Sequence, residues 1–79
     1  MLDIEGRLAN RLLILHRKFA DKDGSLHLSQ SELADFLGAT RESINKVLRT
    51  WLAEGIVELT RGSVRVRDLD QLSERCSIG

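Results

Sequence analysis

The sequence predicts a mostly helical fold with one small β-hairpin, and three observations support this prediction. The chain has 79 residues, 42% hydrophobic and 30% charged, which suits one domain with a single core. Apolar residues recur every three to four positions in three segments, a spacing typical of amphipathic helices. Near the C-terminal end, two short β-like runs flank a turn that contains glycine, which is typical of a hairpin.

The first helix is predicted from Glu5 to Ala20. Leu8, Leu12, Leu15 and Phe19 recur at helical spacing and are expected to face the core. Residues 21–25 (Asp-Lys-Asp-Gly-Ser) have the composition of a turn, and residues 26–28 (Leu-His-Leu) are apolar enough for a very short strand.

The second helix is predicted to begin with a capping box at residues 29–32 (Ser-Gln-Ser-Glu). Leu33, Phe36 and Leu37 supply its expected buried face. Gly38 is placed to end it, because a left-handed residue without a Cβ avoids a steric cost.

The third helix, Arg41–Ala53, follows after a short turn, with Thr40 as its predicted N-cap. Its apolar stripe has the strongest periodicity in the chain and consists of Ile44, Val47, Leu48, Trp51 and Leu52. The opposite face is polar and carries Glu42, Asn45, Lys46 and Arg49.

A hairpin is predicted from the runs 56–59 and 64–67 around the turn 60–63 (Thr-Arg-Gly-Ser). Asp68 is then expected to cap a short last helix over residues 68–72. Two helices joined by a tight turn that contains glycine indicate a helix-turn-helix, and the hairpin after them corresponds to a wing.

The formal net charge is zero, but the charges are unevenly distributed. Residues 40–67 contain six bases and three acids, whereas acids outnumber bases in the segments on either side. The chain is therefore expected to have one basic side. A recognition helix must leave its first residues free to reach base edges in a major groove, and Arg41, Glu42, Asn45 and Lys46 meet this demand.

From Leu28 onward, the run Leu-Ser-Gln-Ser-Glu-Leu-Ala-Asp-Phe-Leu-Gly-Ala-Thr-Arg-Glu-Ser-Ile-Asn-Lys-Val-Leu resembles the C-terminal DNA-binding domain of the CRP/FNR family of bacterial transcription regulators. The similarity continues through residues 53–58, the Arg61-Gly62 turn and residues 67–72. The Glu-Leu-Ala, Gly and Thr-Arg-Glu-Ser elements in this register are more specific than a general winged helix.

This resemblance implies sequence-specific binding of double-stranded DNA, with the recognition helix 41–53 in the major groove and the wing 57–67 on the backbone. Arg41 and Glu42 correspond to the family's half-site readers, suited to guanine and to the N4 amine of cytosine. Lys46 stands where the family usually has arginine, so discrimination at that base is expected to be looser. Asn45 occupies a variable position and contacts a base edge or nothing.

Backbone contacts are expected from small polar groups and bases near the helix starts and on the wing. The predicted set is Ser29, Gln30, Ser31, Thr40, Ser43, Arg49, Arg61 and Ser63. Arg65 and Arg67 alternate along the second wing strand and are either a solvated face or further DNA contacts.

A full member of the family also carries an effector-binding domain and a dimerisation helix, for which 79 residues have no room. Residues 1–79 are therefore expected to be a single winged-helix domain of a longer regulator, the alternative being a naturally short protein. No cofactor or metal is expected in this chain. The implied partners are a palindromic double-stranded operator, a second copy in the full-length homodimer and, as a candidate, RNA polymerase. The isolated domain is expected to be monomeric.

Other classes of function have less support in the sequence. No membrane-length apolar run and no basic leader are present, which indicates a cytoplasmic protein. No catalytic residue is predicted, because paired carboxylates, an activated nucleophile and a phosphate-binding loop are all lacking. A winged helix used as a protein-interaction module is the alternative, which the zero net charge favours slightly. His16, His27 and Cys76 are expected to be idle, whereas Leu8, Leu12, Leu15, Phe19, Val47, Leu48 and Trp51 are expected to form the core.

Overall fold

The computed structural model describes residues 4–76 and has four helices and three strands in this range. The ends of the predicted domain 1–79, residues 1–3 and 77–79, lie outside the described residues. The elements in chain order are α1 (Ile4–Phe19), β1 (Ser25–Leu26), α2 (Gln30–Leu37), α3 (Arg41–Ala53), β2 (Val57–Thr60), β3 (Ser63–Val66) and α4 (Leu69–Glu74). The predicted class, mostly helical with a small hairpin, is confirmed.

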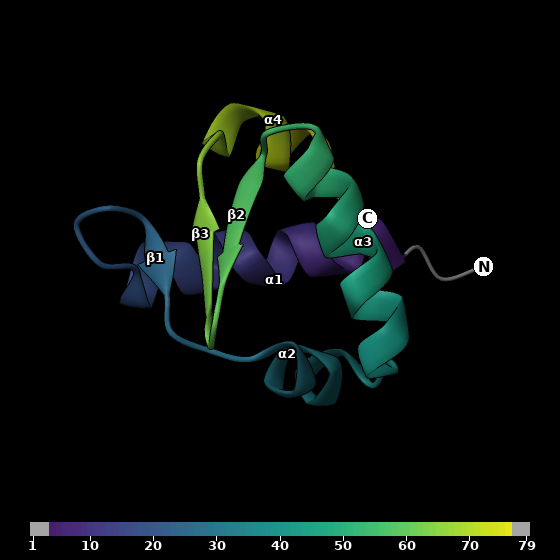
Figure 1. The fold of residues 1–79 in the computed structure, drawn as a ribbon. Coiled ribbons are helices and arrows are strands. Elements are labelled where there is room, and N and C mark those ends of the chain that lie inside the picture. Colours follow the sequence, from purple (N-terminus) through teal and green to yellow (C-terminus); the bar gives the residue numbers. More distant parts are fainter. Residues whose placement is uncertain (1–3, 77–79) are drawn as a thin grey trace.

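The three strands form one antiparallel sheet in the order β1-β3-β2. In the wing, Val57 pairs with Val66 and Thr60 with Ser63, so the turn is short and Gly62 adopts a φ of 73° within it. Strand β1 adds to the other side of β3 through the pair Leu26 and Val64. Figure 1 shows α1 behind the sheet, with the hairpin turn reaching down toward α2 and α3 standing at one side.

The strand predicted over residues 26–28 is shorter than expected and shifted. It covers Ser25–Leu26, because β3 offers pairing partners to these two residues, and His27 and Leu28 lie beyond the last pair. The backbone N–H of Leu28 instead donates to the Leu26 carbonyl at 3.1 Å as the chain turns toward α2.

The helix-turn-helix forms as its cap residues predict. The Ser29 hydroxyl accepts from the Glu32 amide and the Glu32 carboxylate accepts from the Ser29 amide, which completes the capping box. Gly38 ends α2 in the left-handed region with a φ of 65°. Thr40 caps α3 by accepting from the Ser43 amide at 3.1 Å, so the turn between the helices spans only residues 38–40.

A single hydrophobic core joins all four helices and the sheet. Leu8, Leu12, Leu48 and Trp51 are buried as predicted, and Leu15 and Val47 are partly buried against the same core. The remaining buried residues with side chains on this core are Ala9, Leu26, Leu33, Ala34, Leu37, Ile44, Ile56, Val57, Val64, Val66 and Leu72.

Three apolar residues expected on buried faces are exposed instead. Phe19 is 67% exposed because it is the last residue of α1 and extends past the core. Phe36 is 57% exposed, since Ala34 rather than Phe36 flanks the buried Leu33 and Leu37 on α2. Leu52 is 44% exposed, because it lies roughly 70° from the centre of the buried stripe of α3 at about 100° per residue.

Candidate nucleic-acid interface

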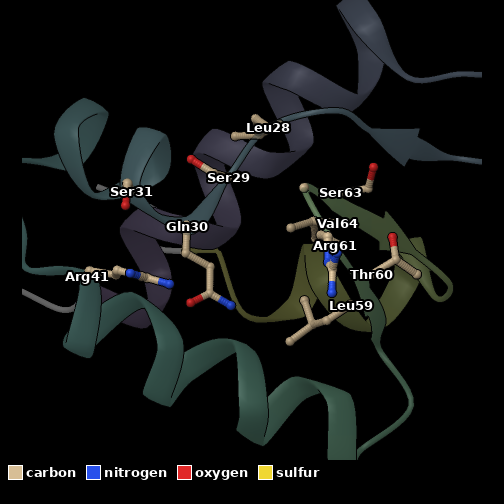
Figure 2. A pocket seen from close by; sticks show the side chains of 11 residues that line it. Leu28, Ser29, Gln30, Ser31, Arg41, Leu59, Thr60, Arg61, Ser63 and Val64 are labelled. Atoms are coloured by element: carbon tan, nitrogen blue, oxygen red, sulfur yellow. The ribbon is translucent and has the colours of Figure 1, made fainter.

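Three segments that are distant in the sequence meet around one groove of about 270 Å³. The start of α2 contributes Ser29, Gln30 and Ser31, and the start of α3 contributes Arg41. The wing contributes residues 59–64, including Arg61 and Ser63. Figure 2 shows Gln30 between Arg41 on one side and Arg61 on the other. Six of the predicted contact residues are thus brought together in one place.

A second, shallower depression of about 410 Å³ continues from this groove along the recognition helix. Gln30 and Arg41 line both, and Glu42 and Asn45 line the second alone. Glu42 is exposed and Asn45 is half-buried. The predicted base readers Arg41, Glu42 and Asn45 therefore share a surface with the predicted backbone contacts.

Lys46 and Arg49 line neither depression. Both are exposed on α3, one and two turns beyond Glu42, so they extend the polar face of the recognition helix away from the groove. The structure therefore separates a compact group at the helix start from these two cations farther along.

Four cations of this surface, Arg41, Lys46, Arg49 and Arg61, have no acidic side chain within ion-pair distance among residues 4–76. In contrast, Arg65 donates to Glu58 at 2.8 Å and to the Asp23 carbonyl at 2.9 Å. Arg67 also lies 3.6 Å from Glu58. The charge of these four side chains is therefore available to an anionic partner, whereas the two strand arginines are engaged within the protein.

The hydroxyl groups differ in what they can offer a phosphate. Thr40 caps the helix by accepting from the Ser43 amide, and it donates its own proton to the Ser43 hydroxyl at 2.9 Å. The Ser43 hydroxyl therefore keeps a proton to donate. Ser29 accepts from Glu32 and also keeps its proton. Ser63 is different, because its hydroxyl is paired with His27 Nδ1 at 3.1 Å.

Sequence reasoning missed two features here. His27 is exposed, as expected, but its Nε2 also contacts the Asp21 carboxylate, so it links the loop before β1 to the wing. Thr60 and the partly buried Leu28 and Leu59 also line the groove. Leu28, Leu59 and Thr60 could have been found from their positions, directly before the α2 cap and next to the hairpin turn. No local pattern could have shown that His27 pairs with Ser63, because the two residues are 36 positions apart.

Two titratable groups outside this surface, Asp23 and Cys76, have altered acidity. Hydrogen bonds from Ser25 hold the pKa of Asp23 below its usual value in the loop before β1. Burial raises the pKa of the Cys76 thiol, which lowers its thiolate fraction. Residues 4–76 contain no group of three or more His, Cys, Asp or Glu side chains placed to hold a metal ion, and none of their helices could cross a membrane.

The fold and this surface define a winged helix-turn-helix with a polar, partly basic recognition helix. The chain belongs to the Crp-like helix-turn-helix domain family, whose model matches residues 6–75.

Known proteins similar to the chain are regulators of this kind. It is 35% identical to a CRP-like cAMP-activated global transcriptional regulator of Mycobacterium tuberculosis, over 92% of this chain and 35% of that protein. Among solved structures, the catabolite activator protein of Thermus thermophilus is 34% identical over 89% of this chain and 32% of the other, with a TM-score of 0.79. Another transcriptional regulator of the CRP family from Thermus thermophilus is 29% identical over 95% of this chain and 40% of the other, with a TM-score of 0.84. The chain spans about a third of the length of its curated relatives.

Proposed function

We propose that this chain binds double-stranded DNA as the DNA-binding domain of a bacterial transcription regulator of the CRP/FNR type. The observation that carries the proposal is the groove where the starts of α2 and α3 meet the wing turn. Hydroxyl groups line it, together with Arg41 and Arg61, which have no ion pair within residues 4–76. Cations and hydrogen-bond donors on a helix-turn-helix suit phosphate oxygens, and the adjoining exposed start of α3 suits a major groove.

Arg41 and Glu42 read a guanine and a cytosine through a bidentate donor and a carboxylate acceptor. Lys46 donates to a further base without the planar fork of arginine, and Asn45 contacts a base edge from the same depression as Glu42. The contacts from Ser29, Gln30, Ser31, Ser43, Arg49, Arg61 and Ser63 fix the register on the backbone, with Thr40 holding the start of α3.

The wider proposal concerns the parent protein. The relatives are about three times as long as the matched region, so residues 1–79 are proposed to be one domain of a longer, dimeric regulator that binds a palindromic operator in the cytoplasm. The isolated domain is proposed to be a monomer that meets one half-site and needs no cofactor or metal. RNA polymerase is a further proposed partner. The family match and the regulators it resembles support DNA binding and do not favour the protein-interaction module.

The test is fluorescence anisotropy of two labelled duplexes at two salt concentrations. One duplex carries a palindrome with the TGTGA-type half-sites that the resemblance implies, and the other is scrambled. The Glu42→Ala variant is expected to lose about 1–3 kcal/mol of preference for the palindrome, because the cytosine amine loses its acceptor. The Arg61→Ala variant is expected to bind both duplexes more weakly by the same factor and to reduce the salt slope by about 1.

The matched control is Arg17→Ala, which removes the same charge from an exposed position on α1 that lines neither depression. Its binding should change much less than that of the Arg61 variant. Equal losses on both duplexes for the Glu42 and Arg61 variants would refute the division into base readers and backbone contacts. No binding to either duplex would refute the proposed function.

A further inference from the structure

The imidazole of His27, which lies between β1 and α2, bonds to the loop after α1 and to the wing. Its Nε2 contacts the carboxylate of Asp21, in the loop that follows α1. Its Nδ1 lies 3.1 Å from the hydroxyl of Ser63, the first residue of β3. Ser63 stands at the rim of the groove between α2 and the wing, and Figure 2 shows its hydroxyl turned away from Gln30. His27 therefore controls a polar group of the interface without lining the groove itself.

The Asp21 carboxylate determines which nitrogen of the neutral imidazole carries the proton. A carboxylate can only accept, so Nε2 must donate to it, and Nδ1 is left as the acceptor. The Ser63 hydroxyl must then donate its single proton to Nδ1. In this state Ser63 has no proton to offer a phosphate oxygen, which needs a donor.

Protonation of His27 reverses the bond between the imidazole and Ser63. Both nitrogens of the imidazolium are donors, so Nδ1 donates to the Ser63 oxygen while Nε2 keeps its contact with Asp21. The Ser63 proton is released and can rotate toward the groove. The same change places a positive charge near the rim, although the imidazole is 66% exposed and solvent screens that charge.

We propose that His27 is a positioning residue for DNA binding, which makes the Ser63 hydroxyl a phosphate donor when the imidazole takes up a proton. This inference deepens the proposed function and rests on it. It requires only a contact to the DNA backbone, so it does not depend on which operator the domain reads.

Other charged side chains lie near His27. Glu32 borders the same surface hollow as His27, Arg65 bonds to the loop before β1, and Arg61 lies in the wing turn beside Ser63. Carboxyl and guanidinium groups ordinarily change charge well outside the interval from about pH 5.5 to about pH 8, whereas histidine changes charge within it. The chain has two histidines, and the other, His16, lies near Gly24 rather than at the groove.

The test measures the affinity for a labelled scrambled duplex at about pH 5.5 and about pH 8, at constant ionic strength. We expect the wild-type chain to bind roughly two- to tenfold more tightly at the lower pH, the factor that one hydrogen bond contributes. Calorimetry near the midpoint of this pH dependence, in two buffers of different ionisation enthalpy, should show proton uptake on DNA binding. His16→Asn is the matched control and should keep the full pH dependence.

Three variants distinguish the reversal of the bond between His27 and Ser63 from a general effect of charge. His27→Asn cannot become charged and should bind equally at both pH values. Ser63→Ala keeps the imidazole but lacks the hydroxyl, and should lose most of the pH dependence. In Asp21→Asn the amide can donate to Nε2 as well as accept from it, so part of the neutral His27 carries its proton on Nδ1 and the pH dependence should weaken.

Retention of the wild-type pH dependence in either Ser63→Ala or His27→Asn would overturn the proposal. A flat wild-type profile with clear DNA binding would overturn the role of His27 and leave the proposed function in place. Absence of binding at both pH values would overturn the proposed function itself, and the role of His27 with it.

Discussion

Residues distant in the sequence make the contacts that were hardest to predict. Trp51 was expected in the core, and its ring is buried there. Its indole Nε1, however, donates to Glu5 at 2.9 Å, across 46 positions of sequence. Periodicity places a residue on a face of its own helix but says nothing of the polar partner that another helix brings. The pairing of His27 with Ser63 escaped prediction for the same reason.

The bond between Trp51 and Glu5 gives a prediction for stability. In Glu5→Ala the indole N–H of the buried Trp51 loses its acceptor, so the free energy of unfolding should fall by about 1–3 kcal/mol. Glu5→Gln retains an oxygen that can accept and should lose less than about 1 kcal/mol. Urea unfolding followed by Trp51 fluorescence measures all three proteins.

The control for this prediction is Glu54→Ala. Glu54 shares the partner Arg75 with Glu5, but the Trp51 indole donates to Glu5 and not to Glu54. Its exposed ion pair should contribute no more than about 1 kcal/mol. If the Glu5 and Glu54 variants lost equal stability, the hydrogen bond to the indole would not be the reason for the loss.

At the scale of elements, the sequence predicted the order correctly and most ends within one or two residues. Helix α3 has the predicted bounds, and the caps at Ser29, Thr40 and Asp68 are all formed. These features are local, because a cap and its amide lie three residues apart. The buried faces of the helices were harder to predict. Phe19 and Phe36 fit the helical spacing but lie outside the arc that the neighbouring elements cover.

The turn between α2 and α3 depends on Gly38. Its φ of 65° is left-handed, and a Cβ there would meet no atom within 4 Å, so the cost of a side chain is conformational rather than steric crowding with other residues. Gly38→Ala should lower the free energy of unfolding by about 1–2 kcal/mol. Gly38→Asn should lose less, because asparagine adopts this conformation more readily.

Urea unfolding of the two variants beside the wild type checks this prediction. Equal losses in the alanine and asparagine variants would show that the left-handed backbone is not what Gly38 supplies. No loss in either would show that the turn tolerates another conformation.

At the scale of the whole molecule, the zero net charge is a poor guide to the partner. Among residues 4–76, acidic residues are spread over the helices, the loop after α1 and the C-terminal segment, and Glu58 pairs with two arginines on the wing. Among residues 4–76, cations without an ion pair lie on α3 and in the wing turn, and others lie on α1 and in the loop after it. The charge count along the sequence predicted a basic side, but only the fold shows that Arg65 and Arg67 are engaged within the protein.

The sequence predicts the separate segments that line the groove, but it does not predict that they come together. The sequence identified the starts of two helices and a hairpin turn, each by local signals at Ser29, Thr40 and Gly62. Their meeting around Gln30 depends on the packing of both helices and the sheet onto one core, which no local pattern encodes.

The most direct test of the central claim is a map of backbone amide shifts in the ¹⁵N-labelled chain as a duplex is added. We expect the largest changes in residues 29–31, 40–46 and 60–63, with those of His27 among the next largest. Changes centred instead on the exposed face around Phe19 and Phe36, or an unchanged spectrum at saturating duplex, would contradict it.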